Sequence, residues 1–108
     1  TGTTQNKLVG WTTANPIAGV VSAIASPAKV IGICASGCGT TGSARVAVKG
    51  RIGCVFDAAP TAGNWAIPSD ATAGNCEDGG SGASKPTNAI GLVYTSTVSG
   101  GTYAVVLF

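Results

Sequence analysis

Apolar and polar side chains alternate between residues 44 and 57, and no segment shows the 3.6-residue period of an amphipathic helix. One face of this run is apolar, and it carries Val46, Val48, Ile52, Cys54 and Phe56. The basic residues Arg45, Lys49 and Arg51 fall on the other face. Successive side chains of a strand point to opposite faces, so the pattern predicts one long strand with a buried side. Gly50 interrupts the buried side at a position typical of a bulge or bend. We interpret the three basic residues as solubilising outward positions, with an anionic ligand stripe as the alternative.

Further short strands are predicted where β-branched or aromatic residues lie between Gly, Pro and Ser turns, at residues 19–25, 29–34, 65–67, 72–76, 88–97 and 102–108. Residues 37–42 and 77–86 are predicted loops, and Gly100-Gly101 favours a hairpin before the last strand. That last strand is apolar on both faces, which predicts a central place in a sheet or packing against another subunit.

The expected fold is all-β: a small single-domain β-barrel or sandwich of short antiparallel strands with an extended N-terminal arm. We assign residues 1–14 to the arm or tether and residues 15–108 to the domain.

Charge is scarce, and its scarcity excludes several functions. Only 9% of the 108 residues are charged, the net charge is +2, and histidine is absent. A His base, a His metal ligand and a Ser-His-Asp triad are therefore excluded, and nucleic acid is not an expected partner. Hydrophobic residues make up 44% of the chain, which argues against disorder. Leu and Phe are few, so the core is expected to be thin and to need disulfides or a subunit interface.

Four cysteines, Cys34, Cys38, Cys54 and Cys76, predict disulfides and an oxidising compartment. Three pairings are open, of which we favour Cys34–Cys38 and Cys54–Cys76. The alternatives are reduced buried thiols or a zinc site. Zinc is disfavoured because only one pair of cysteines is closely spaced.

Neither membrane insertion nor catalysis is expected. Residues 8–28 carry no charge, but they include Pro16 and Pro27 and lack the Leu and Ile density of a spanning helix. The acidic residues Asp57, Asp70, Glu77 and Asp78 match no glycosidase or calcium spacing. Asp57 instead precedes a turn, where Asp is common. We therefore predict no enzyme, no cofactor and no metal.

The aromatic residues carry the candidate contacts. Trp11, Trp65, Tyr94 and Tyr103 are interpreted as core or interface anchors, with sugar stacking as the alternative. The predicted assembly interface comprises Trp11, Tyr103, Val105, Leu107 and Phe108. The candidate ligand-binding residues are Trp65, Glu77 and Asp78.

Four segments carry a resemblance to a known family. They are A-R-V-A-V-K-G-R-I-G-C-V-F-D, A-P-T-A-G-N-W-A-I-P-S, A-I-G-L-V-Y-T-S-T and G-G-T-Y-A-V-V-L-F. Together they resemble small β-barrel domains of phage capsid-decoration and head-fibre proteins, and the C-terminal domains of bacterial extracellular fibre-like proteins. The resemblance covers residues 30–108, and it implies non-enzymatic modules that self-associate, often as trimers.

The cysteines and the C-A-S-G-C-G-T-T-G loop depart from decoration proteins assembled inside cells, and favour a secreted fibre or surface appendage. We therefore expect a structural subunit, secreted, extracellular or on a virion surface, whose partners are copies of itself in a trimer or polymer. The alternative is a carbohydrate-binding adhesin or receptor-binding head whose partners are surface glycans.

Overall fold

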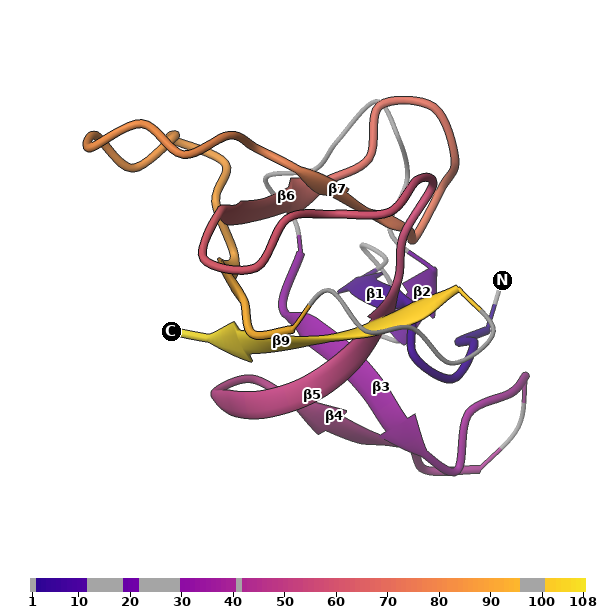
Figure 1. Ribbon diagram of the computed structural model, residues 1–108. Helices are drawn as coiled ribbons and strands as arrows, with labels where there is room; N and C mark the ends of the chain where they lie inside the picture. The colour runs from indigo at the N-terminus through magenta and orange to yellow at the C-terminus, as the bar shows by residue number, and fades with distance from the viewer. Residues whose placement is uncertain (1, 12–18, 22–29, 41, 96–100) are drawn as a thin grey trace.

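The strands of the chain form two antiparallel sheets, as a computed structural model of residues 2–11, 19–21, 30–40, 42–95 and 101–108 describes them (Figure 1). The first sheet has the order β2-β1-β3-β4 and contains β1 (Leu8–Trp11), β2 (Gly19–Val21), β3 (Gly32–Ser36) and β4 (Arg45–Ala47). The second has the order β5-β9-β8-β6-β7 and contains β5 (Gly50–Val55), β6 (Trp65–Pro68), β7 (Cys76–Asp78), β8 (Gly91–Val93) and β9 (Thr102–Leu107). Helices are absent from these ranges. The predicted all-β class with short antiparallel strands is confirmed.

The long strand predicted over residues 44–57 is wrong, because the chain changes sheets in its middle. β4 ends at Ala47 in the first sheet, and β5 begins at Gly50 in the second. Gly50 has a φ of 91°, a left-handed conformation that glycine adopts without strain. Val48 lies in this connection and is 61% exposed, although the alternation placed it on the buried side.

The N-terminal segment also differs from its prediction as an arm over residues 1–14. Leu8 and Val9 are buried in β1, which pairs with both β2 and β3. The preceding residues form backbone hydrogen bonds with both sheets: Asn6 N–H donates to Cys34 O at 2.9 Å, and Val55 N–H donates to Asn6 O at 2.9 Å. Residues 2–11 are therefore part of the domain, and residues 12–14 lie outside the described ranges. Two apolar side chains at positions 8 and 9 gain more by burial than by exposure on a tether.

One core is shared by the two sheets. Leu8 and Ile33 from the first sheet meet Val93, Val105 and other buried residues of the second. β9 lies between β5 and β8, which confirms the central place predicted for the last strand. Its side chains alternate, so that Tyr103, Val105 and Leu107 are buried while Ala104 and Val106 are half-buried on the outer face. The Phe56 and Tyr103 rings pack edge to face with centroids 5.6 Å apart.

Both predicted disulfides are present. Cys34–Cys38 closes the short loop after β3. Cys54–Cys76 joins β5 to β7, the two edge strands of the second sheet. Next to it, Phe56 and Cys76 form an isolated parallel bridge. The edges of the sheet thus approach each other at one point, but the described strands do not form a closed barrel.

Two other predicted segments shift along the chain. Residues 72–76 were expected to form a strand, but residues 72–75 form a turn and β7 begins at Cys76. Gly74 has a φ of 80°, which fits a turn rather than a strand. Consequently Glu77 and Asp78 belong to β7, and the predicted loop over residues 77–86 begins at Gly79.

Candidate functional site

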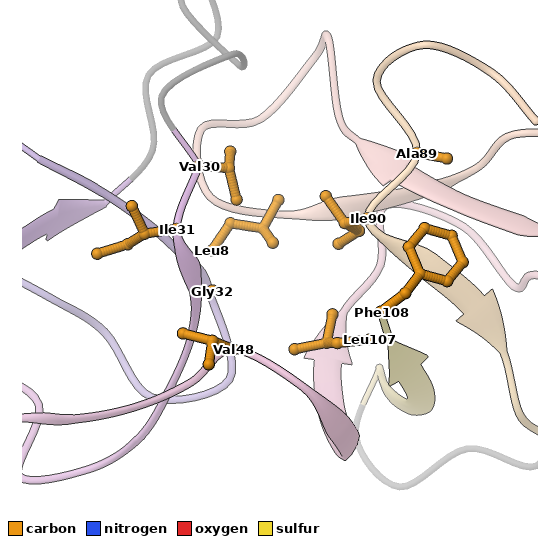
Figure 2. Close-up of a pocket in the computed structure, with 9 residues that line it drawn as sticks. All are labelled: Leu8, Val30, Ile31, Gly32, Val48, Ala89, Ile90, Leu107 and Phe108. Carbon is orange, nitrogen blue, oxygen red and sulfur yellow. The ribbon is translucent and has the colours of Figure 1, made fainter.

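An apolar groove of about 200 Å³ opens between the two sheets near the C-terminus (Figure 2). Leu8 and Gly32 lie on the side of the first sheet, and Leu107 lies on the side of the second. Val48, from the connection between the sheets, lies at its edge. The remaining lining residues are also apolar: Val30, Ile31, Ala89, Ile90 and Phe108. None of the nine carries a polar side chain, and the polar atoms that face the groove are those of the backbone.

The groove has a buried floor and an exposed rim. Leu8 and Leu107 are 1% and 5% exposed and form part of the protein core. Ile31, Val48 and Phe108 are 37%, 61% and 49% exposed. Large apolar side chains exposed together in this way are typical of interaction surfaces. The rim therefore leaves apolar area that a partner could bury.

Phe108 extends this surface onto the outer face of the second sheet. Its ring packs against the Trp65 ring with centroids 6.1 Å apart, and Lys85 Nζ lies 4.6 Å from the Phe108 ring centroid. Along the same face, cross-strand pairing places Leu92 beside Val106 and Val106 beside Arg51. This outer face is therefore apolar, with positive charge at its margins.

An exposed aromatic residue lies on the same face. Tyr94 is 55% exposed, and the Arg51 guanidinium carbon lies 4.8 Å from its ring centroid. Such a cation–π pair contributes about 0.5–1 kcal/mol at an exposed site. The pair leaves much of the Tyr94 side chain in contact with solvent.

The three candidate ligand-binding residues lie on the neighbouring strands β6 and β7, and their polar atoms bond within the chain. Trp65 is half-buried and its Nε1–H donates to Gly82 O at 2.8 Å. Glu77 Oε1 accepts from Asp70 N–H at 3.2 Å. The Asp78 carboxylate accepts from Thr61 N–H at 2.9 Å and from Gly80 N–H at 2.7 Å. Burial raises the pKa of Asp78, but hydrogen bonds from Thr61, Gly80 and Asn64 outweigh it and leave the pKa below the usual value. These contacts order the loops around β6 and β7.

A second carboxylate organises the turn between β6 and β7. Asp57 accepts hydrogen bonds from the Ser69 hydroxyl and, at 2.7 Å, from Asn75 Nδ2. Ser69 Oγ in turn accepts from Ala71 N–H at 3.0 Å and Thr72 N–H at 3.1 Å. Burial raises the pKa of Asp57. Hydrogen bonds from Ser69, Asn75 and Thr72, together with the charge of Lys7, lower it by more than burial raises it. The net effect is a lowered pKa and a turn fixed in one shape.

The predicted assembly residues divide between core and surface. Tyr103 and Val105 are buried in the core of the single chain. The central position of β9 buries its inner face within one subunit. Leu107 is buried but lines the groove, and Phe108 is exposed on its rim. Trp11 belongs to β1, and its side chain lies outside the described part of the chain.

Sequence reasoning missed most of the groove. Val30, Ile31, Val48 and Ile90 come from loops and strand ends, and only the packing of two sheets brings them together. Val48 fits the alternation of residues 44–57, so the pattern itself gives no sign that this side chain is exposed. The local clue is Gly50, two residues later, where the chain leaves the first sheet.

The described residues include no group of three or more His, Cys, Asp or Glu side chains arranged to hold a metal ion. In the same ranges, no helix is long and apolar enough to cross a membrane. Comparison of the chain with protein-family models, with curated proteins and with solved structures gives no match.

Proposed function

We propose that this protein is a non-enzymatic structural subunit that self-assembles through the apolar groove near its C-terminus. The observation that carries the proposal is the rim of Ile31, Val48 and Phe108, which is exposed above a buried apolar floor. A second copy that covers this rim would remove apolar area from water, worth about 25 cal/mol per Å².

The two disulfides support a place for this subunit outside the cell, because disulfides persist in oxidising compartments. An extracellular fibre or a virion surface are both such places. The resemblance of residues 30–108 to phage head-fibre and bacterial fibre domains points the same way, and it remains a prediction. Trimer and polymer are both compatible with the groove itself.

The test replaces one rim residue and measures association. Val48→Asp places a charge on the rim at an exposed position, so folding is expected to survive. Ala44→Asp makes the same change of charge at an exposed position just before β4 and is the matched control. Mass photometry and light scattering at micromolar concentration should show oligomers of the unaltered protein and of Ala44→Asp. Val48→Asp should associate at least about tenfold more weakly, because a buried unpaired charge costs several kcal/mol. A monomeric unaltered protein, or a Val48→Asp variant that associates normally, refutes the proposal.

A carbohydrate-binding head is the second candidate, and the exposed Tyr94 beside Arg51 favours it. A tyrosine ring offers a flat apolar face, and arginine pairs with carboxylate or phosphate groups. Glycan-array binding that disappears in Tyr94→Ala but persists in Tyr94→Phe would support this role. The absence of binding to any glycan on the array would refute the carbohydrate-binding role.

A further inference from the structure

We infer that the partner of the groove is the acidic turn of a second copy, so that subunits join head to tail. This inference rests on the proposed self-assembly and adds which two surfaces meet. We define the basic end as the groove together with Lys49, Arg51 and Lys85. We define the acidic turn as residues 57–59 and 69–75.

Three exposed cations belong to the basic end. Lys49 lies in the connection from β4 to β5, next to the groove residue Val48, and Arg51 follows within β5, where its guanidinium faces the ring of Tyr94. Lys85 lies over the ring of Phe108, on the groove rim. The groove is lined by no charged side chain, and Lys49 and Lys85 adjoin its rim residues Val48 and Phe108. An apolar centre with a charged margin is the usual anatomy of a protein–protein interface.

The acidic turn offers the complementary surface. Its exposed side chains are small or acidic: Asp57, Ala58, Ala59, Asp70, Ala71, Thr72 and Ala73. Glu77, half-buried in the middle of β7, adds a further carboxylate, which accepts from Asp70 N–H. Small apolar side chains match a shallow groove, and the carboxylates match the cations at its margin. Electrostatic complementarity of this kind selects partners and speeds association.

The acidic turn is also held rigid before any partner arrives. Asp57 bonds to both Ser69 and Asn75, and Ser69 N–H donates to Asn75 O at 2.9 Å. A surface fixed in advance loses less conformational entropy on binding than a mobile one. The contacts that order this turn thus prepare it for docking.

The two surfaces lie on opposite sides of the molecule. In Figure 1 the C-terminus, the start of β5 and the loop after β7 lie at the left, whereas the turn between β6 and β7 lies at the right. The contact is therefore heterologous, because each subunit uses two different surfaces. Contacts of this type generate rings or open chains rather than isolated two-fold dimers.

The test reverses one charge on each surface. Lys85→Glu impairs the basic end and Asp70→Lys impairs the acidic turn, and each leaves the other surface intact. Each variant alone should associate at least about tenfold more weakly than the unaltered protein, because like charges then face each other. Arg45→Glu, at an exposed position at the start of β4, makes the same change of charge as Lys85→Glu and should associate normally.

Mixing the two variants gives the decisive measurement. The intact basic end of Asp70→Lys can bind the intact acidic turn of Lys85→Glu, so the mixture should form heterodimers that grow no further. Only folded variants can restore one another, so the mixture also controls for folding. Mass photometry with one variant carrying a mass tag identifies the heterodimer.

The other outcomes overturn the inference. If either variant associates normally, or if folded variants fail to form a heterodimer, the two surfaces do not meet. If the mixture grows like the unaltered protein, these charges do not define the contact. In each of these cases the self-assembly proposal still stands when the unaltered protein forms oligomers that Val48→Asp disrupts. A monomeric unaltered protein instead refutes self-assembly itself.

Discussion

At the scale of single residues, the scarce carboxylates organise turns. Asp57 and Asp78 each collect several hydrogen bonds, and each connects segments distant in sequence. A charged acceptor stabilises such bonds more than a neutral one does. The sequence indicated that Asp57 precedes a turn, but its partners Ser69 and Asn75 are set by the folded chain and could not be derived from local pattern.

The Asp57 network predicts a measurable cost. Asp57→Asn keeps the shape of the side chain but removes its charge, and should lower the free energy of unfolding by about 1 kcal/mol. Urea denaturation at neutral pH measures this difference. Asp70→Asn, in the same turn, is the control, because the cost should be confined to Asp57. Equal stability of Asp57→Asn and the unaltered protein would show that the network contributes nothing.

The pH dependence of the same pair of proteins gives an independent check. The folded pKa of Asp57 lies below its value of 3.8 in a model compound, so the unfolded state binds more protons in this range. The stabilisation from Asp57 is therefore complete above the unfolded pKa and is lost as the pH falls through the folded pKa. Asp57→Asn lacks this contribution, so its stability relative to the unaltered protein should improve toward acid pH. A constant difference from pH 7 to about pH 3 would contradict this.

At the scale of strands, two glycines are required where backbones meet. A Cβ added to Gly91 in β8 would lie 2.1 Å from Val106 O in β9, and one added to Gly32 in β3 would lie 2.2 Å from Ala47 O. Backbone atoms cannot move aside as a flexible side chain does. Gly91 therefore sets the spacing between β8 and the central strand β9.

Gly91→Ala should lower the free energy of unfolding by about 1–3 kcal/mol, the usual range for overpacking a well-packed site. Thermal melting followed by far-UV circular dichroism measures the loss. Gly82→Ala is the matched control, because a Cβ there meets no atom closer than 4.0 Å. If both variants melt like the unaltered protein, the close approach of β8 and β9 is not limiting.

Strands were predicted well where the alternation of side chains is uninterrupted. β9 lies within its predicted segment and β6 exceeds its predicted range of 65–67 only by Pro68, because one face of each packs on the core. The prediction failed at β4 and β5 because Gly50 adopts a left-handed φ and sends the chain into another sheet. An alternating pattern does not distinguish one long strand from two consecutive strands whose even-numbered residues both face the core. β1 was missed because only Leu8 and Val9 mark it between polar and glycine residues.

At the scale of the whole molecule, the N-terminal segment joins the two sheets. Thr3 N–H donates to Gly39 O at 2.9 Å, and Asn6 bonds to Cys34 of β3 and Val55 of β5. The groove depends on this arrangement, because Leu8 on its floor follows the same segment. The groove could not be predicted from sequence, since it exists only where the sheets meet.

Removal of residues 1–7 also removes the bond from Cys34 N–H to Lys7 O, so it should lower the free energy of unfolding by about 4 kcal/mol, given roughly 1 kcal/mol for each of four backbone hydrogen bonds. Removal of residues 1–2 alone leaves these four bonds in place and is the control. Chemical denaturation of both truncated chains measures the difference. If they are equally stable, the segment does not hold the sheets together.

The Cys54–Cys76 bond has a mechanical consequence for a head-to-tail chain. Tension between neighbouring subunits would enter at the acidic turn, which ends directly at Cys76. From there the covalent link passes the load to β5, which leads to the basic end at Lys49 and Arg51. The hydrogen bonds between β6 and β7 would then carry little of this load, and the disulfide would limit the extension of the subunit. Reducing agents should therefore lower the stiffness of such a chain of subunits before its subunits dissociate.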